Sequence, residues 1–194
     1  MIRLFVAIPF PVEVRERLAL MSGGVPGARW TTVDNFHLTV RFIGEVDRHG
    51  YDDVVAALGQ VRAPSFDLTL ARIDQFGKGD KARVLWIGVE KNPPLLHLHE
   101  RIESALVRAG LEPEGRKYSP HVTLARLQGA PSGRLAAFVQ TNHLVRIGPL
   151  KVDRFALFSS WSRGEGPLYE IEADFALGAL AAPSAGPTVT PPGG

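Results

Sequence analysis

The sequence contains no cysteine, so it can form neither disulfide bonds nor thiolate metal sites. It also lacks an apolar run that approaches the roughly 18 residues of a membrane-spanning helix. The opening segment 1–9 is too short and too alternating to be typical of a signal peptide. We therefore expect a cytoplasmic protein that does not associate with membranes.

The chain has little net charge, formally +2, and no charged side chain beyond Asp174. This mild basic excess permits an anionic substrate but does not indicate a long groove for nucleic acid. Segment 177–194, which is rich in Ala, Pro and Gly, is predicted to be a disordered tail. The hydrophobic share of 45% is ordinary for a globular protein. We therefore expect residues 1–176 to form one domain with two lobes.

Hydrophobic periodicity predicts more strands than helices. The expected strands lie at 2–8, 36–43, 66–73, 84–89, 121–127, near 150–159 and near 168–176, and the expected helices lie at 11–21, 52–61, 94–109 and 133–140. Ser132 is the expected cap of the last helix. This order implies hairpins, which favours an α+β fold with antiparallel sheets.

One short pattern occurs twice, 84 residues apart. The first copy, 37–40, reads His-Leu-Thr-Val, and the second, 121–124, reads His-Val-Thr-Leu. On a strand, each copy would turn its His and Thr toward one face and its two aliphatic residues toward the other. A single copy has little diagnostic value, but a repeat in each half predicts a pseudo-symmetric site.

Two imidazoles that face one substrate can act as a general base and a general acid near neutral pH, because an unperturbed imidazole has a pKa of about 6.5. We therefore predict that His37 and His121 are catalytic. Thr39 and Thr123 would lie on the same faces as the histidines and offer hydroxyl donors. The residues alone do not indicate which histidine has which role.

With its flanking residues, the repeat resembles the two-histidine phosphoesterases, and specifically the RNA 2′,3′-cyclic phosphodiesterases, historically called 2′-5′ RNA ligases. The similarity includes residues 3–8, Trp30, residues 35–44, residues 84–89 and residues 119–126. It implies a bilobal, pseudo-two-fold α+β fold in which two antiparallel sheets with flanking helices face a central cleft. It also implies metal-independent opening of the 2′,3′-cyclic phosphate at an RNA end to a 2′-phosphomonoester.

The resemblance further implies a role for each site residue. His121 would take a proton from the attacking water, and His37 would protonate the departing 3′ oxygen. Thr39 and Thr123 would bond the non-bridging phosphate oxygens, and Arg126 would add positive charge to the same group.

Strand geometry disagrees with the role of Arg126, because a residue five positions after His121 on a flat strand faces away from it. A strand end or a bulge near Ala125 would remove the disagreement, as would a side chain that wraps back. Arg41 has the same parity as His37 and is expected to compete for the phosphate.

Aromatic residues near the motifs are candidates for base stacking, and Phe36 and Tyr118 are the ones we expect to contact a terminal base or the phosphate. Phe42 has the parity of Leu38 and is expected in the core. His97 and His99 are two positions apart on a predicted helix, so they should not share a face as metal ligands would.

The expected substrate is therefore an RNA 3′ end or oligonucleotide with a 2′,3′-cyclic phosphate. We expect no cofactor, no metal and no obligatory protein partner, and a monomer in solution. Two other functions use the same site: 2′-5′ ligation of RNA ends, and hydrolysis of another small cyclic phosphate. A non-catalytic module that binds RNA ends is the alternative from a different class.

Overall fold

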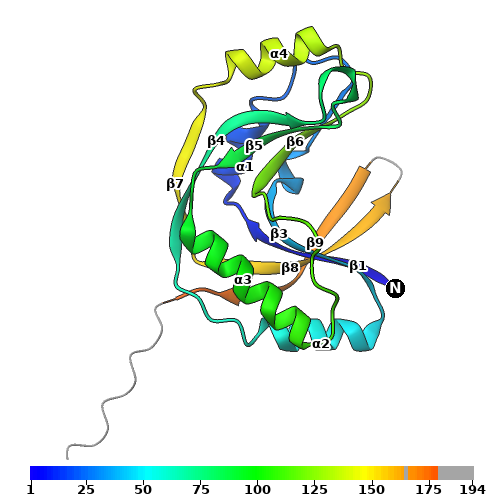
Figure 1. The fold of residues 1–194 in the computed structure, drawn as a ribbon, viewed down its shortest axis with the longest axis vertical. Helices are drawn as coiled ribbons and strands as arrows, with labels where there is room; N and C mark the ends of the chain where they lie inside the picture. The colour runs from blue at the N-terminus through cyan, green and yellow to red at the C-terminus, as the bar shows by residue number, and fades with distance from the viewer. Residues whose placement is uncertain (164–165, 179–194) are drawn as a thin grey trace, which may run out of the picture.

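The computed structural model describes residues 1–163 and 166–178 and contains two antiparallel sheets (Figure 1). The first sheet has the order β3 (His37–Val46), β1 (Ile2–Pro9), β8 (Arg154–Arg163) and β9 (Gly166–Ala176). The second has the order β2 (Ala28–Trp30), β6 (His121–Leu127), β5 (Val84–Val89), β4 (Phe66–Phe76) and β7 (Arg146–Val152). The expected α+β fold with two antiparallel sheets is confirmed.

Four α-helices in the described part of the chain flank these sheets: α1 (Val12–Ala19), α2 (Arg48–Leu58), α3 (Pro93–Arg108) and α4 (Ser132–Thr141). Helices α2 and α3 pack against each other, and Figure 1 shows them along the first sheet, whereas α4 lies at the far end of the second. Local sequence explains where two of them begin. The Asp47 side chain accepts a hydrogen bond from the Gly50 N–H, and the Asn92 side chain accepts one from the Leu95 N–H.

Two local predictions were wrong, and one strand was missed. Ser132 is the first residue of α4 rather than its cap, and Pro131 precedes it with no side-chain bond. The strand expected near 150–159 is two strands, β7 and β8, and Pro149 is tolerated because β7 lies at the edge of its sheet. The short strand β2 was not predicted.

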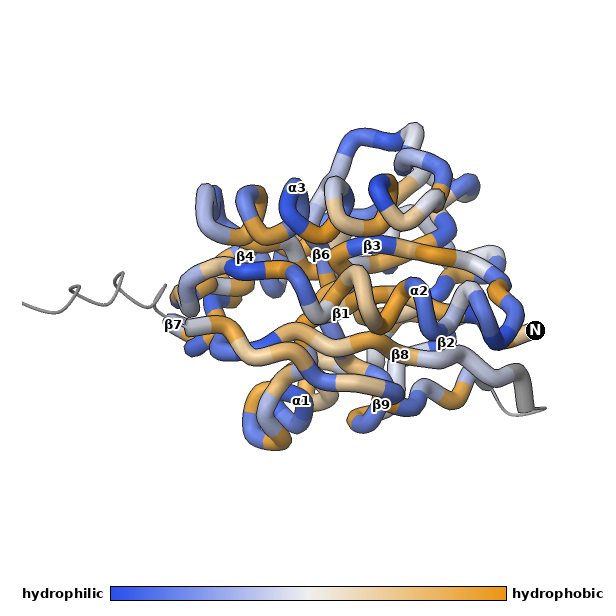
Figure 2. Tube along the Cα trace, turned by 90° about the horizontal axis from the view of Figure 1, so that it is seen from below, coloured by the Kyte–Doolittle hydropathy of each residue, from blue (hydrophilic) through white to orange (hydrophobic). Residues whose placement is uncertain are grey.

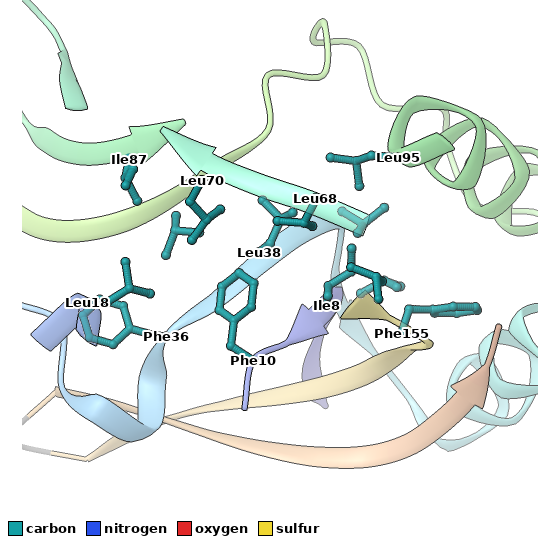
Figure 3. Close-up of a cluster of buried hydrophobic side chains, with 14 of the residues drawn as sticks. Ile8, Phe10, Leu18, Phe36, Leu38, Leu68, Leu70, Ile87, Leu95 and Phe155 are labelled. Atoms are coloured by element: carbon teal, nitrogen blue, oxygen red, sulfur yellow. The ribbon is translucent and has the colours of Figure 1, made fainter. Parts of the chain in front are cut away.

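One large core lies between the two sheets. Figure 3 shows Ile8, Leu38 and Phe155 of the first sheet and Leu68, Leu70 and Ile87 of the second in the space between the two sheets. Each of these six side chains is essentially buried. Helix α3 adds the apolar face expected from its spacing, and Figure 2 shows its alternating hydrophilic and hydrophobic turns. The two lobes therefore share one core.

The domain extends slightly past its expected end. Leu177 is buried in the core, and its N–H donates to the Asp153 carbonyl oxygen at 2.7 Å. The rest of the expected disordered tail, residues 179–194, lies outside the described residues. Among the residues that the structure describes, no helix is both long and apolar enough to cross a membrane.

Candidate active site

Both motif histidines are the first residue of their strand. His37 begins β3, at the edge of the first sheet, and His121 begins β6, between β2 and β5 of the second. The alternation predicted from the sequence is present. The aliphatic residues of each motif are buried in the shared core, while each His and Thr is half-buried on the opposite face.

The two imidazoles are held in the same way. His37 Nδ1 lies 2.8 Å from the Asn35 carbonyl oxygen, and His121 Nδ1 lies 2.7 Å from the Ser119 carbonyl oxygen. In both cases the acceptor is two residues earlier in the chain. A carbonyl oxygen only accepts, so Nδ1 must carry the proton, and the other nitrogen, Nε2, remains for proton exchange with a substrate.

Each motif strand contains a bulge at the same position, three residues after its histidine. In β3, Thr39 pairs with Ala7 and Arg41 pairs with Val6, so Val40 has no partner in β1. In β6, Thr123 pairs with Trp86 and Ala125 pairs with Leu85, so Leu124 has no partner in β5. An extra residue of this kind reverses the face of the sheet to which the side chains after it point.

The bulge in β6 places Arg126 on the face of His121 and Thr123. Leu124 and Ala125 are buried in succession, and Arg126 is exposed. The conflict between the strand geometry of a flat β6 and the expected role of Arg126 is thus removed by a bulge next to Ala125, one of the explanations considered from the sequence.

The bulge in β3 makes two predictions wrong. Arg41 does not share a face with His37; it is only 6% exposed and lies on the core side. Phe42, which was expected in the core, is 62% exposed on the histidine side, with its ring 6.1 Å from that of Phe5. Local sequence does not signal this reversal, because neither bulge is marked by a glycine or a proline.

Arg41 instead joins three segments of the fold. Its guanidinium pairs with the Glu103 carboxylate on α3 and lies 3.6 Å from the Glu114 carboxylate, and it donates to the Glu112 carbonyl oxygen. Burial raises the pKa of Glu103, but hydrogen bonds from the Glu114 N–H and from Arg41 lower it by more. Arg41 therefore ties β3 to α3 and to the segment before β6.

His37 lies among aromatic rings of the first sheet. Its ring centroid is 4.9 Å from that of Phe5, 5.7 Å from Phe158 and 5.1 Å from Tyr169, the last edge-on. The pKa of His37 is lowered to about 4. Burial among these rings is the main cause, the bond to the Asn35 carbonyl oxygen opposes it, and the charge of His121 adds a smaller lowering effect. In the free protein at neutral pH, His37 is neutral. Sequence reasoning missed these aromatic neighbours. The available signal was that Phe5 has the same strand parity as Ala7, the residue that pairs with Thr39.

His121 has a smaller aromatic surrounding in the second sheet. The Phe76 ring meets it edge-on at 4.8 Å, and the Trp86 ring lies 6.0 Å away. Phe158 lies on β8, two strands away from β3, and Phe76 lies on β4, two strands away from β6. The two residues therefore occupy corresponding positions. The two histidines therefore have related aromatic supports from non-adjacent parts of the sequence.

The two motif strands approach each other directly. The Tyr118 hydroxyl, just before β6, donates to the Thr39 carbonyl oxygen of β3 at 3.1 Å. The Thr31 hydroxyl donates to the Thr123 carbonyl oxygen at 2.9 Å. These bonds connect the motifs to each other and to the residue that follows β2. The two histidines are close enough for the charge of His121 to lower the pKa of His37.

The expected base-stacking residues are placed elsewhere. Phe36 is 3% exposed in the shared core, because it precedes β3 on the aliphatic side. The Tyr118 ring stacks on His99 at 4.1 Å, and burial raises the pKa of its hydroxyl. One face of the Tyr118 ring is thus covered by His99, and its hydroxyl supports the Thr39 backbone. Within the described residues, no three His, Cys, Asp or Glu side chains gather in a way that could hold a metal ion.

Comparison with known proteins agrees with this geometry. Residues 29–162 match the sequence profile of the 2′-5′ RNA ligase superfamily. An RNA 2′,3′-cyclic phosphodiesterase of Thermotoga maritima is 32% identical over 176 residues, which is 87% of this chain and 92% of the relative. Another of the same description, from Aeropyrum pernix, is 32% identical over 80% of this chain and 89% of its own length.

The fold is also similar to solved structures. The structure of Escherichia coli LigT complexed with 3′-AMP aligns with a TM-score of 0.71 and 29% identity, over 91% of this chain and 98% of LigT. A protein from Thermus thermophilus aligns with a TM-score of 0.73 and 26% identity, over 92% of this chain and all of the other.

Proposed function

Since the chain belongs to the 2′-5′ RNA ligase superfamily, we propose that it hydrolyses RNA 2′,3′-cyclic phosphate ends to 2′-phosphomonoesters. The observation that best supports this reaction is the matched pair of imidazoles. Both are anchored through Nδ1 to the carbonyl two residues earlier, so that both Nε2 atoms remain for proton transfer. A reaction that takes up one proton and delivers another needs two such groups.

In the proposed reaction, His121 Nε2 accepts a proton from a water molecule, and the water oxygen forms a bond to phosphorus. The bond from phosphorus to the 3′ oxygen breaks, and His37 Nε2 gives that oxygen a proton. The Thr39 and Thr123 hydroxyls donate to the non-bridging oxygens, where negative charge accumulates. Arg126, on the face of His121, adds positive charge.

The charge state of His37 sets a condition on these roles. Its pKa of about 4 keeps it neutral in the free protein, whereas an acid must be protonated before it acts. A bound phosphate anion favours the charged imidazole and raises that pKa. We therefore propose that the substrate itself brings His37 into its acid form.

The test is to incubate the purified protein, with EDTA present, with a short RNA that ends in a 2′,3′-cyclic phosphate. The product is compared with authentic 2′- and 3′-phosphate standards and is tested with phosphatase. Conversion to the 2′-phosphate is expected. The 3′-phosphate would overturn the proposed leaving group, and joined RNA ends would favour ligation. Binding without turnover would favour the non-catalytic module.

A further inference from the structure

A cavity of about 610 Å³ lies next to the exposed end of the second motif strand. Three arginines line it: Arg29 from β2, Arg83 just before β5, and Arg126 from β6. The other lining residues are Val84 and the segment 127–129. We name this feature the arginine pocket.

Backbone pairing fixes the arginines next to one another. Arg29 and Arg126 are directly opposite in the pairing of β2 with β6, and Val84 is opposite Arg126 in the pairing of β5 with β6. The Arg83 carbonyl oxygen accepts from the Leu127 N–H at 2.8 Å, and the Arg83 N–H donates to the Phe76 carbonyl oxygen at 2.9 Å. The three side chains therefore start from a regular, hydrogen-bonded backbone.

The charges of the arginine pocket are unbalanced. No Asp or Glu is among its lining residues, and none of its three arginines takes part in an ion pair within the described parts of the chain. Like charges directly opposite on a sheet repel each other. An anion among them would relieve that repulsion, and guanidinium groups match phosphate oxygens through paired hydrogen bonds.

The arginine pocket is adjacent to the motif but separate from the catalytic phosphate position. Arg126 follows Thr123 by three residues, but because Leu124 is bulged the same interval on β5 runs only from Trp86 to Val84, which is about 7 Å at about 3.3 Å per residue. Arg126 stands at the boundary, with Arg29 beside it on β2 and Arg83 beside Leu127, one residue further from the histidine. A phosphate held by the threonines would therefore have a second phosphate as its neighbour in this pocket.

We propose that the arginine pocket binds the phosphate on the 5′ side of the terminal nucleotide while the cyclic phosphate occupies the histidine site. This inference rests on the proposed function. It specifies the substrates as RNA chains, or single nucleotides, that have a phosphate on the 5′ side of the nucleotide with the 2′,3′-cyclic phosphate. A nucleoside 2′,3′-cyclic phosphate without a 5′-phosphate lacks the group that the pocket binds. The protein then discriminates between substrates by a phosphate group that takes no part in the reaction.

The test compares a nucleoside 2′,3′-cyclic phosphate with the same compound carrying a 5′-phosphate, so that the base and sugar are identical. For the wild type, kcat/KM is expected to be at least about tenfold higher with the 5′-phosphate, as one charge-assisted contact would give. In Arg29→Ala and Arg83→Ala, this ratio falls toward one. Arg101→Ala, which removes an exposed arginine from α3, keeps the wild-type ratio.

A binding measurement separates this proposal from the proposed reaction. Calorimetry compares the nucleoside 2′-phosphate with the 2′,5′-bisphosphate, and circular dichroism checks that each variant is folded. Tighter binding of the bisphosphate that depends on Arg29 and Arg83 is expected, and it would support the arginine pocket even if no cyclic phosphate were turned over. Equal affinities in the wild type, or a preference unchanged in Arg29→Ala and Arg83→Ala, would overturn the pocket while leaving hydrolysis intact.

Discussion

The two motif strands have the same backbone arrangement but differ in the side chains that follow the motif. β3 and β6 each begin with a histidine anchored through Nδ1, and each has a bulge three residues later. After the bulge, β3 continues with Arg41 and Phe42, and β6 continues with Ala125 and Arg126. The first residue of each pair is buried and the second is exposed.

This difference shows how two strands with the same backbone arrangement can form an asymmetric site. On the first sheet, the histidine face is aromatic, with Phe5 and Phe158 beside His37 and Phe42 beside Phe5. On the second sheet, the face continues into arginines. A nucleotide is asymmetric in the same sense, since it has an aromatic base and anionic phosphates. We therefore expect the base toward the first sheet and the phosphate chain toward the second.

The largest expected effect tests the equivalence of the two histidines. His37→Ala and His121→Ala should each lower kcat by about 10²–10⁴-fold, because each removes one positioned acid or base. Steady-state rates on a 2′,3′-cyclic phosphate substrate measure this, with circular dichroism to confirm folding. A near-normal rate in either variant would mean that the repeat is not a catalytic pair.

The next effect concerns the buried residue after the bulge. Arg41→Met should lower the free energy of unfolding by about 3 kcal/mol, because it leaves the Glu103 carboxylate without its partner. Denaturant titration measures this change. Combining Arg41→Met with Glu103→Gln should recover part of the loss. If Arg41→Met unfolded like the wild type, Arg41 would not be a structural link between β3 and α3.

A smaller effect concerns pH. His37 has a pKa of about 4 in the folded protein and about 6.5 when unfolded, so between these values the unfolded chain binds the extra proton. The free energy of unfolding should therefore fall as pH decreases through this range, by on the order of 1 kcal/mol between about pH 7 and pH 5. His37→Gln should lose this part of the pH dependence. An unchanged dependence in His37→Gln would contradict the low pKa.

The smallest effects sharpen the contrast between Phe42 and Arg126. Phe42→Ala should raise KM several-fold with little dependence on salt, because an aromatic face binds a base by stacking. Arg126→Ala should raise KM by about tenfold at low salt and by less at high salt, because its contribution is electrostatic. KM measured at two ionic strengths tests both variants. The same salt response in both would remove the distinction between the two faces.

The sequence was sufficient to predict the features that depend on the alternation of polar and apolar residues along a strand. Leu38, Val40, Val122 and Leu124 are buried, as strand periodicity predicted, and the paired motifs lie on strands of two antiparallel sheets. The reversal in β3 was not predicted, and the bulge in β6 was only one of several explanations for Arg126, because both bulges arise from pairing with β1 and β5 and not from a local breaker residue.

The aromatic surroundings of His37 also required the fold. They come from β1, β8 and β9, which are neighbours in the sheet although β1 and β8 lie near opposite ends of the sequence. The arginine pocket has the same character, since Arg29, Arg83 and Arg126 become neighbours only through strand pairing.

The most direct test of the proposed reaction follows the attacking oxygen. A short RNA with a 2′,3′-cyclic phosphate end is converted in water enriched in the heavy oxygen isotope, with EDTA present, and the product is analysed by mass spectrometry. We expect one heavy oxygen per product, located on a 2′-phosphate, beside an unlabelled 3′ hydroxyl. A product without the label, or a labelled 3′-phosphate, would contradict hydrolysis with the 3′ oxygen as the leaving group.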